Sequence, residues 1–356
     1  MKRLDIILIL CVVFLTFFGL LMIYDASSFV AFRDFGDKYH YLKGQLFWAV
    51  AGISLMAAFS FFDYHRLHNL SLPLILVALI MLILVFIPGV GLNLLGARRW
   101  IDLKIFLLQP AEFVKLSLAI YLAAWFSKKE KGRILPFSLL VVLLLFLVIL
   151  QPDMGTSVVI LVEALAIFFL SGGNVFYFLS SIPILGALGL LLIKISPYRA
   201  ERLATFLNPN QDIQSSSYHV KQILIALGNG GVFGVGLGNS LQKYAYLPEN
   251  TTDSIFAIIA EELGFLGSAI LIGVFAVVVW RGFKIAAGAP DNFGRLLAGG
   301  ITTFLGAQMI INLGAQTVLL PLTGIPLPFI SYGGSALIVD LCAVGILLNI
   351  ARQSRA

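Results

Sequence analysis

Long apolar runs recur along almost the whole chain, and they constrain its fold more than any other feature. The runs extend over about 17 to 26 residues, which is long enough for a helix to cross a hydrocarbon layer of roughly 30 Å. A membrane β-barrel would instead show alternating segments of about ten residues. Because backbone polar groups must be satisfied internally in lipid, the runs predict an all-α polytopic membrane protein.

The composition agrees with a membrane location, since 60% of the residues are hydrophobic and only 12% are charged. Soluble domains usually contain roughly 25% charged residues. We expect one integral membrane domain over residues 1–356 with ten transmembrane helices. The expected spans are 6–24, 44–62, 70–87, 110–126, 134–150, 154–170, 175–195, 255–280, 296–320 and 335–350. The first run is longer than a secretory signal and lacks a clear cleavage site, so we interpret it as a span.

An even number of spans places both termini on one side of the membrane. The short loops on that side contain more Lys and Arg than the short loops on the other, which predicts cytoplasmic termini. The net charge of +6 is explained by contact with anionic lipid headgroups. We therefore expect membrane lipids, and not nucleic acid, as partners.

The segment 196–252 forms one large extracellular loop between the seventh and eighth spans. Loops of this length are usually functional or disordered. Apolar residues, aromatic residues and the glycine-rich stretch LGNGGVFGVGLGNS indicate a partly structured, half-buried or re-entrant segment. Its glycines do not have the spacing of a dinucleotide-binding loop. Its positive charges, Arg199, Arg202, Lys221 and Lys243, suggest either an anionic ligand or lipid headgroups.

Carboxylates in and beside the eighth span need an explanation in so apolar a chain. Asp253 opens this span at the water boundary, where a helix N-cap is the structural alternative to a functional acid. Glu261 and Glu262 lie deeper, and we interpret them as structural groups with at least one facing the bundle interior. Glu112 and Lys115 share a face of the fourth span and offer one polar partner for them.

Histidines and cysteines give little evidence for a metal centre. His65 and His68 have a suitable spacing, with Asp63 and Arg66 nearby, but no further ligands follow, so a metal there is not expected. His40 and His219 are isolated, and neither an HExxH motif nor a cysteine cluster occurs.

Five stretches together resemble one protein family. They are GARRWIDL, QPAEFVKLSL, QPDMGTS, LPENTTDSIFAIIAEELGFLG and PLTGIPLPFISYGGSA, in this order along the chain. They resemble the FtsW/RodA/SpoVE family of shape, elongation, division and sporulation proteins, and GLGNSLQKYAYLPEN looks more like its division and sporulation branch. The resemblance implies a peptidoglycan glycosyltransferase that polymerises lipid II at the outer face of the cytoplasmic membrane, together with a class B penicillin-binding transpeptidase.

The resemblance also implies a set of site residues. Asp253 matches the family's catalytic carboxylate, which would act as general base while undecaprenyl pyrophosphate leaves. Candidate substrate-binding residues are Arg98, Arg99, Glu112, Lys115, Arg202, Lys243, Glu249 and Ser331. For Glu112 and Lys115 a purely structural ion pair is an equal alternative. Mg²⁺ or Mn²⁺ is plausible beside the pyrophosphate and no organic cofactor is expected.

The chain departs from the usual family pattern beside the acid. Thr252 stands where His is common, and Ser254 stands where Phe is common. Two other functions are also compatible with the sequence. A flippase for lipid-linked precursors would use a polar cavity but no base at the outer boundary, and a non-catalytic scaffold for the transpeptidase would tolerate the loss of Asp253.

Overall fold

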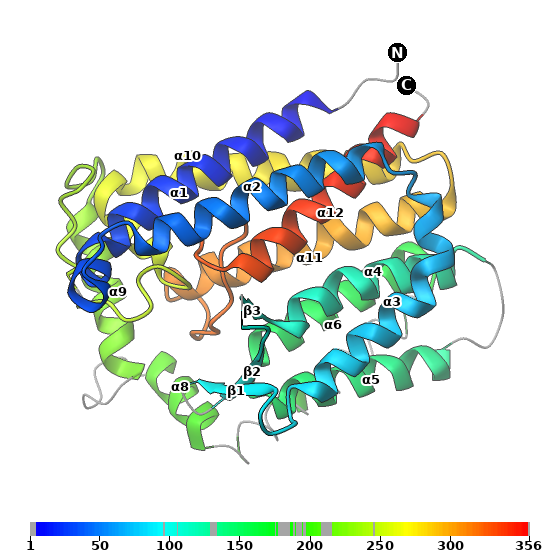
Figure 1. Ribbon diagram of the computed structural model, residues 1–356, viewed down its shortest axis with the longest axis horizontal. Coiled ribbons are helices and arrows are strands. Elements are labelled where there is room, and N and C mark those ends of the chain that lie inside the picture. Colours follow the sequence, from blue (N-terminus) through cyan, green and yellow to red (C-terminus); the bar gives the residue numbers. More distant parts are fainter. Residues whose placement is uncertain are drawn as a thin grey trace.

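The computed structural model describes residues 5–94, 97–104, 106–128, 134–174, 197–207, 216–244 and 246–354, and a few isolated positions from 176 to 194. These residues form a bundle of helices with a small sheet near one end (Figure 1). The helices are α1 (Ile6–Phe35), α2 (His40–Phe61), α3 (His65–Leu84), α4 (Pro110–Phe126), α5 (Ile134–Leu150), α6 (Met154–Leu170), α8 (Pro197–Leu207), α9 (Ser216–Gly230), α10 (Ile255–Ala287), α11 (Asn292–Gln316) and α12 (Gly334–Gln353).

The prediction of a helical multi-pass membrane protein is confirmed. Within the described part of the chain, six helices are long and apolar enough to cross a membrane, namely α1, α2, α3, α10, α11 and α12. Helices α4, α5 and α6 begin and end at the predicted residues. The expected seventh span, 175–195, falls almost entirely outside the described residues.

Local signals explain why two of these helices begin where they do. Pro110 occupies the first turn of α4, where its missing N–H leaves no intrahelical bond unmade. Asp153 caps α6, because its carboxylate accepts a hydrogen bond of 3.0 Å from the Thr156 N–H. Such signals are local in sequence and could therefore be used for prediction.

Helix α1 is longer than expected, because it continues past residue 24 to Phe35. The charge of Asp25 does not end the helix, since its carboxylate is paired with Lys243. The helix ends at Gly36, which has a left-handed φ of 70° and donates its N–H to the Phe32 carbonyl.

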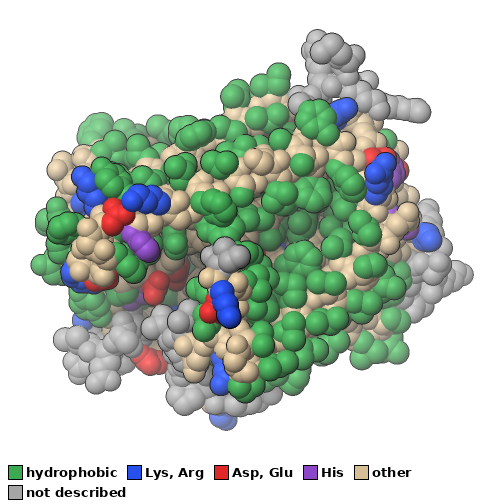
Figure 2. Space-filling model, viewed as in Figure 1, with side chains coloured by type: hydrophobic (Ala, Val, Ile, Leu, Met, Phe, Trp, Pro, Cys, Tyr) green, Lys and Arg blue, Asp and Glu red, His purple; other side chains and the backbone are tan. Residues whose placement is uncertain are grey.

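The most buried spans are α11 and α12. Helix α12 packs against α2, whereas α11 contacts α10 on one side and α4 and α6 on the other. Helix α1 covers α10 and α2, and α3 packs on α4 (Figure 1). Hydrophobic side chains cover most of the visible lateral surface, while many of the charged ones gather toward the two ends (Figure 2). This distribution fits helices that lie across a bilayer.

Both ends of the described chain lie at the same end of the bundle (Figure 1). Asp5, just before α1, pairs with Arg281 near the end of α10. Ser354, just after α12, donates a hydrogen bond to the Gly288 carbonyl, which follows α10. The small sheet, α8 and α9 lie toward the opposite end.

A small antiparallel sheet, which was not predicted from the sequence, precedes α4. Its strands are β1 (Gly91–Leu94), β2 (Ala97–Asp102) and β3 (Leu107–Leu108), in the order β1-β2-β3. Gly91 pairs with Ile101, which in turn pairs with Leu108. The register shifts beside Arg99, because Leu92 pairs with Trp100 and its neighbour Asn93 pairs with Arg98, so Arg99 lies at a bulge of β2.

Helix α10 is interrupted at Gly264, whose φ of 67° and ψ of −167° are not helical. The glycine-rich segment 231–236 fits against this break and bonds the backbone groups near it. Gly234 is needed there because an added Cβ would lie 2.0 Å from the Glu262 carbonyl oxygen. The four backbone bonds are Val235 N–H to Glu261 O at 3.0 Å, Gly236 N–H to Glu262 O at 3.0 Å, Phe265 N–H to Gly231 O at 2.9 Å and Leu266 N–H to Val232 O at 3.1 Å.

We expect Gly264→Ala to destabilise the folded protein by about 1–3 kcal/mol, because a non-glycine residue is strained in this conformation. Its Cβ would also lie 2.3 Å from the Gly234 backbone nitrogen. Gly273→Ala in the same helix is the matched control, since nothing lies within 4 Å of its Cβ. The control should be neutral or more stable. Thermal unfolding in detergent measures both, and equal midpoints would contradict the prediction.

Candidate active site

The turn before α10 presents Asp253 beside the bundle. Ser254 and not Asp253 is the N-cap of α10, so the interpretation of Asp253 as a helix cap is wrong. The Asp253 carbonyl accepts a hydrogen bond of 3.0 Å from the Asn312 side chain on α11. This bond fixes the backbone and leaves the Asp253 carboxylate, which is partly exposed, beside Gly324.

The segment before α12 holds the same turn from another side. Ser331 donates a hydrogen bond of 2.5 Å to the Thr252 carbonyl, and the Tyr332 N–H donates one of 2.9 Å to the Thr251 carbonyl. The Ser331 side chain is buried and also accepts from the Leu327 N–H at 2.8 Å. These contacts make Ser331 a support for the turn.

The predicted residue Glu249 lies at the start of this turn with an exposed side chain. Its carbonyl accepts the N–H groups of Thr252 and Ser254 at 3.2 and 3.1 Å. Its carboxylate accepts the Thr252 hydroxyl at 2.9 Å. Glu249 therefore stabilises the local turn and still faces solvent.

Two opposing effects act on the Asp253 carboxylate. Burial raises its pKa above the ordinary value, because the charged form is poorly solvated. A hydrogen bond from Thr252 and the positive charges of Arg202 and Arg99 lower the pKa in part. The structure therefore brings together three residues that are far apart in the sequence: one carboxylate and two guanidinium groups.

Neighbouring carbonyl groups hold the two guanidinium groups in place. Arg99 donates to the carbonyls of Gln151 and Pro152 at 3.0 and 2.5 Å. Arg202 donates to the Leu322 carbonyl at 2.7 Å. Arg98, the neighbour of Arg99 on β2, is exposed and donates to the Phe86 carbonyl at 3.3 Å. The structure thus separates Arg98 from the pair that acts on Asp253.

Glu112 and Lys115 form an ion pair of 2.6 Å inside the bundle, as their spacing indicated. Each side chain is only 1% exposed. Lys115 also lies close enough to Glu163 and Asp340 to interact with them electrostatically. This buried polar cluster is distinct from the turn that presents Asp253.

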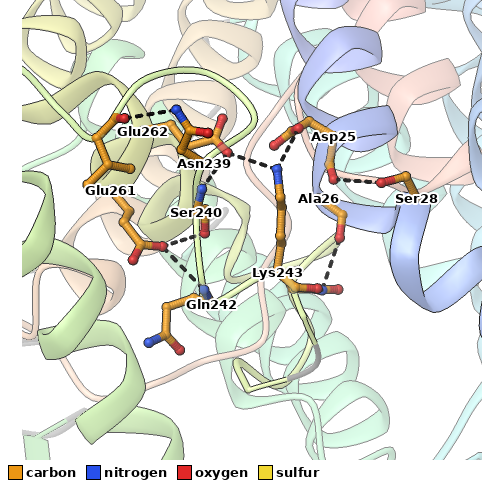
Figure 3. A network of polar contacts seen from close by, with 11 residues as sticks. Asp25, Ala26, Ser28, Asn239, Ser240, Gln242, Lys243, Glu261 and Glu262 are labelled. Carbon is orange, nitrogen blue, oxygen red and sulfur yellow. Dashed lines mark hydrogen bonds and ion pairs between the residues drawn. The ribbon is translucent and has the colours of Figure 1, made fainter.

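The predicted substrate residue Lys243 lies in a buried network (Figure 3). Its ammonium group is 2.9 Å from an Asp25 oxygen and 3.3 Å from a Glu262 oxygen. Glu261 accepts hydrogen bonds from Asn229 and Ser240 beside it. The expectation that Glu262 and Glu261 would pair with Glu112 and Lys115 is wrong, because the loop before α10 supplies their partners. We interpret Lys243 as a structural cation on these contacts.

Three side chains near the turn had no assigned role in the sequence analysis. His219, which looked isolated, lies 2.7 Å from the Ser254 hydroxyl. Asn312 donates a hydrogen bond to the Asp253 carbonyl. Asp153 accepts a hydrogen bond from Thr156 and directly follows Gln151 and Pro152, whose carbonyls bind Arg99. Only Asp153 had a local signal, the QPDMGTS motif. The other two contacts join residues too distant in sequence for any spacing rule.

The side chains of the described residues do not by themselves form a divalent metal site. Among them, no group of three or more His, Cys, Asp or Glu side chains is arranged to hold an ion. The Nδ1 atom of His65 lies 2.7 Å from an Asp63 oxygen, and its Nε2 atom lies 3.2 Å from an Asp291 oxygen. We therefore derive no chemical step through Mg²⁺ or Mn²⁺.

Comparisons with known proteins agree with this architecture. Residues 5–356 match the FtsW/RodA/SpoVE family, described as cell cycle protein. The chain is 42% identical to stage V sporulation protein E of Bacillus subtilis, covering 99% of this chain and 98% of that protein. It is 41% identical to a probable peptidoglycan glycosyltransferase FtsW of Trichlorobacter lovleyi, covering 98% and 93%.

Solved structures show the same fold. One chain of a peptidoglycan synthase complex superimposes with a TM-score of 0.80 at 28% identity and covers 99% of both chains. The crystal structure of the rod shape determining protein RodA of Thermus thermophilus has a TM-score of 0.74 at 27% identity, covering 99% of this chain and 98% of that one.

A helical bundle with several apolar spans, in which a carboxylate and two cations are brought together, is the architecture of a polytopic membrane protein with a polar site. The chain belongs to the FtsW/RodA/SpoVE family. The predicted likeness to its FtsW and SpoVE members is confirmed, as is the prediction of a peptidoglycan glycosyltransferase.

We expect Lys243→Met to destabilise the protein by about 3–5 kcal/mol, because the substitution leaves the buried Glu262 carboxylate and the partly buried Asp25 carboxylate without their cation. Lys43→Met is the control, since it breaks the Lys43–Asp37 pair at 2.7 Å on an exposed surface. Solvent screens such a pair, so its loss should change little. Thermal unfolding in detergent compares the variants, and similar midpoints would argue against the structural role of Lys243.

Proposed function

We propose that this protein polymerises lipid II into glycan strands, with Asp253 as the general base. The observation that carries the proposal is the partly exposed Asp253 carboxylate at the start of α10, within electrostatic reach of Arg99 and Arg202. A base must be available to the substrate, and a departing pyrophosphate must be stabilised. This one site offers groups for both tasks.

In the proposed reaction, a hydroxyl group of the acceptor sugar attacks the anomeric carbon of the donor. Asp253 accepts the hydroxyl proton as the new glycosidic bond forms. The bond between the anomeric carbon and the pyrophosphate oxygen breaks, and undecaprenyl pyrophosphate leaves as an anion. A second carboxylic acid, which glycosidases use to protonate the leaving group, is therefore not required.

Arg99 and Arg202 are the cations that we assign to the pyrophosphate. Guanidinium groups bind phosphate oxygens with charge-assisted hydrogen bonds and stabilise the negative charge that develops on the leaving group. Their anchoring to backbone carbonyls limits their movement. Arg98 and Glu249 are exposed near this region, so we propose secondary contacts for them with substrate or headgroups.

For Glu112 and Lys115 we propose a structural role inside the bundle. They lie inside the bundle and neutralise each other, which suits a fixed polar cluster. For Ser331 we propose an indirect role, because it holds the carbonyl next to Asp253.

We propose that the protein has ten spans in a single domain and lies in the cytoplasmic membrane with both termini in the cytoplasm. The shared position of Asp5 and Ser354 at one end of the bundle supports an even number of spans. Asp253 then faces the outside, where lipid II and the growing glycan strand meet it. A class B penicillin-binding transpeptidase is the proposed partner, supported by the similarity to a peptidoglycan synthase complex.

A lipid II flippase is the second candidate. The buried cluster around Lys115 favours it, since charged groups inside a membrane bundle often mark a transport path. A flippase does not need a base at Asp253, and neither does a non-catalytic scaffold. The loss of that carboxylate therefore separates the three functions.

We expect Asp253→Asn to lower lipid II polymerisation by about 10²- to 10⁴-fold, because the amide cannot accept the hydroxyl proton. The assay uses the purified protein with its transpeptidase partner and measures glycan strands. Asp102→Asn is the control, since it removes an exposed carboxylate from β2. Undiminished polymerisation by Asp253→Asn would exclude Asp253 as the base.

The pH dependence of the rate tests the electrostatic arrangement. A general base works only when deprotonated, so the rate should rise with pH through the raised pKa of Asp253, with a midpoint above the ordinary range of an aspartate. Because Arg99 and Arg202 lower this pKa, replacing either with Ala should raise the pKa and move the midpoint to higher pH. Arg98→Ala is the neighbouring control and should leave the midpoint in place. A midpoint that does not move in Arg99→Ala or Arg202→Ala would contradict this arrangement.

A further inference from the structure

A hydrogen bond between two side chains joins α9 to the start of α10. His219 lies on α9, and its Nε2 atom is 2.7 Å from the Ser254 hydroxyl oxygen. Ser254 is fully buried and follows Asp253 directly in the chain. One peptide bond therefore joins the residue that His219 contacts to the proposed base.

The Ser254 hydroxyl does not form the bond that its position usually provides. A serine at a helix N-cap normally accepts a hydrogen bond from the backbone N–H two or three residues later. Here the N-cap side chain makes no such bond, although Ser254 occupies that position in α10. The hydroxyl is directed to His219 instead, so a tertiary contact replaces a local one.

His219 makes this contact as a neutral ring at ordinary pH. Burial, together with the charge of Arg202, lowers the pKa of its imidazole to about 4, and the charge of Glu249 opposes the shift. A neutral imidazole adds no charge beside Asp253. Removing His219 therefore changes the geometry of the turn at Asp253 and not the charge beside it.

We infer that His219 is a positioning residue that holds the Asp253 carboxylate in place through Ser254, an inference that rests on the proposed function. Asn312 on α11 fixes the Asp253 carbonyl from one side. His219 fixes the next residue from α9. The proposed base is thus held between side-chain hydrogen bonds from two different helices.

Loss of the imidazole frees the Ser254 hydroxyl to cap α10, and the turn can relax. A displacement of about 1 Å in a catalytic group can lower the rate by about 10²-fold. Arg99 and Arg202 are held by other carbonyls, so substrate binding should change much less. The effect should therefore appear in kcat and not in KM.

The experiment measures initial rates of lipid II polymerisation over a range of lipid II concentrations, with the partner transpeptidase present. The variants are His219→Ala, His219→Gln, Ser254→Ala and the double variant His219→Ala/Ser254→Ala. His40→Ala is the control, because that histidine stacks on Phe35 and has no contact with this turn among the described interactions. Asp253→Asn is measured alongside, and thermal unfolding confirms that each variant is folded.

We expect His219→Ala to lower kcat by about 10- to 100-fold with KM changed less than about threefold. His219→Gln, which keeps a hydrogen-bonding side chain, should recover a large part of kcat. The double variant should be no slower than the slower single variant, because both changes break one interaction.

The inference is overturned if folded His219→Ala keeps its kcat or changes KM alone. It is also overturned if His219→Gln does not recover kcat, or if the losses of the two single variants add up in the double variant. If Asp253→Asn is inactive while His219→Ala is fully active, only the role of His219 is lost. If Asp253→Asn remains active, the proposed base itself is wrong. The two failures are thus distinguishable.

Discussion

The ammonium group of Lys243, held between Asp25 and Glu262, is the interaction on which the end of the bundle that carries Asp253 depends. It joins α1, the loop before α10 and α10 itself. Inside a bundle surrounded by lipid, each of these charges would be costly alone, so the three segments can be buried only together. The adjoining glycine-rich segment then fills the break at Gly264 and fixes the path of the chain toward Asp253.

The properties of Asp253 follow from where this path ends. The turn lies at the edge of the bundle, where burial favours the protonated acid and two nearby guanidinium groups favour the carboxylate. A group held between these influences can stay charged and still accept a proton. Asn312 and His219 hold the backbone of this turn through hydrogen bonds, which is the support that we propose for a base at Asp253. Charge, access and position therefore come from different parts of the fold.

Much of the fold was predictable because its signals are local. The ends of α4 and α6 follow from Pro110 and Asp153, and the ion pair of Glu112 and Lys115 follows from their helical spacing. Asp253 was found through its motif. The extension of α1 was missed, since a charged residue inside a helix looks like a boundary until its partner is known. The small sheet was missed because short strands leave only a weak pattern.

The sequence by itself determined the membrane class, most helix positions and the candidate base, because apolar run length, capping residues and motifs act over a few neighbouring residues. Only the tertiary structure decided which charges meet. It assigned Lys243 to buried carboxylates, separated Arg98 from Arg99, and brought His219 to the start of α10. These contacts join segments far apart in the chain, and their energies depend on burial and distance, which no local pattern records.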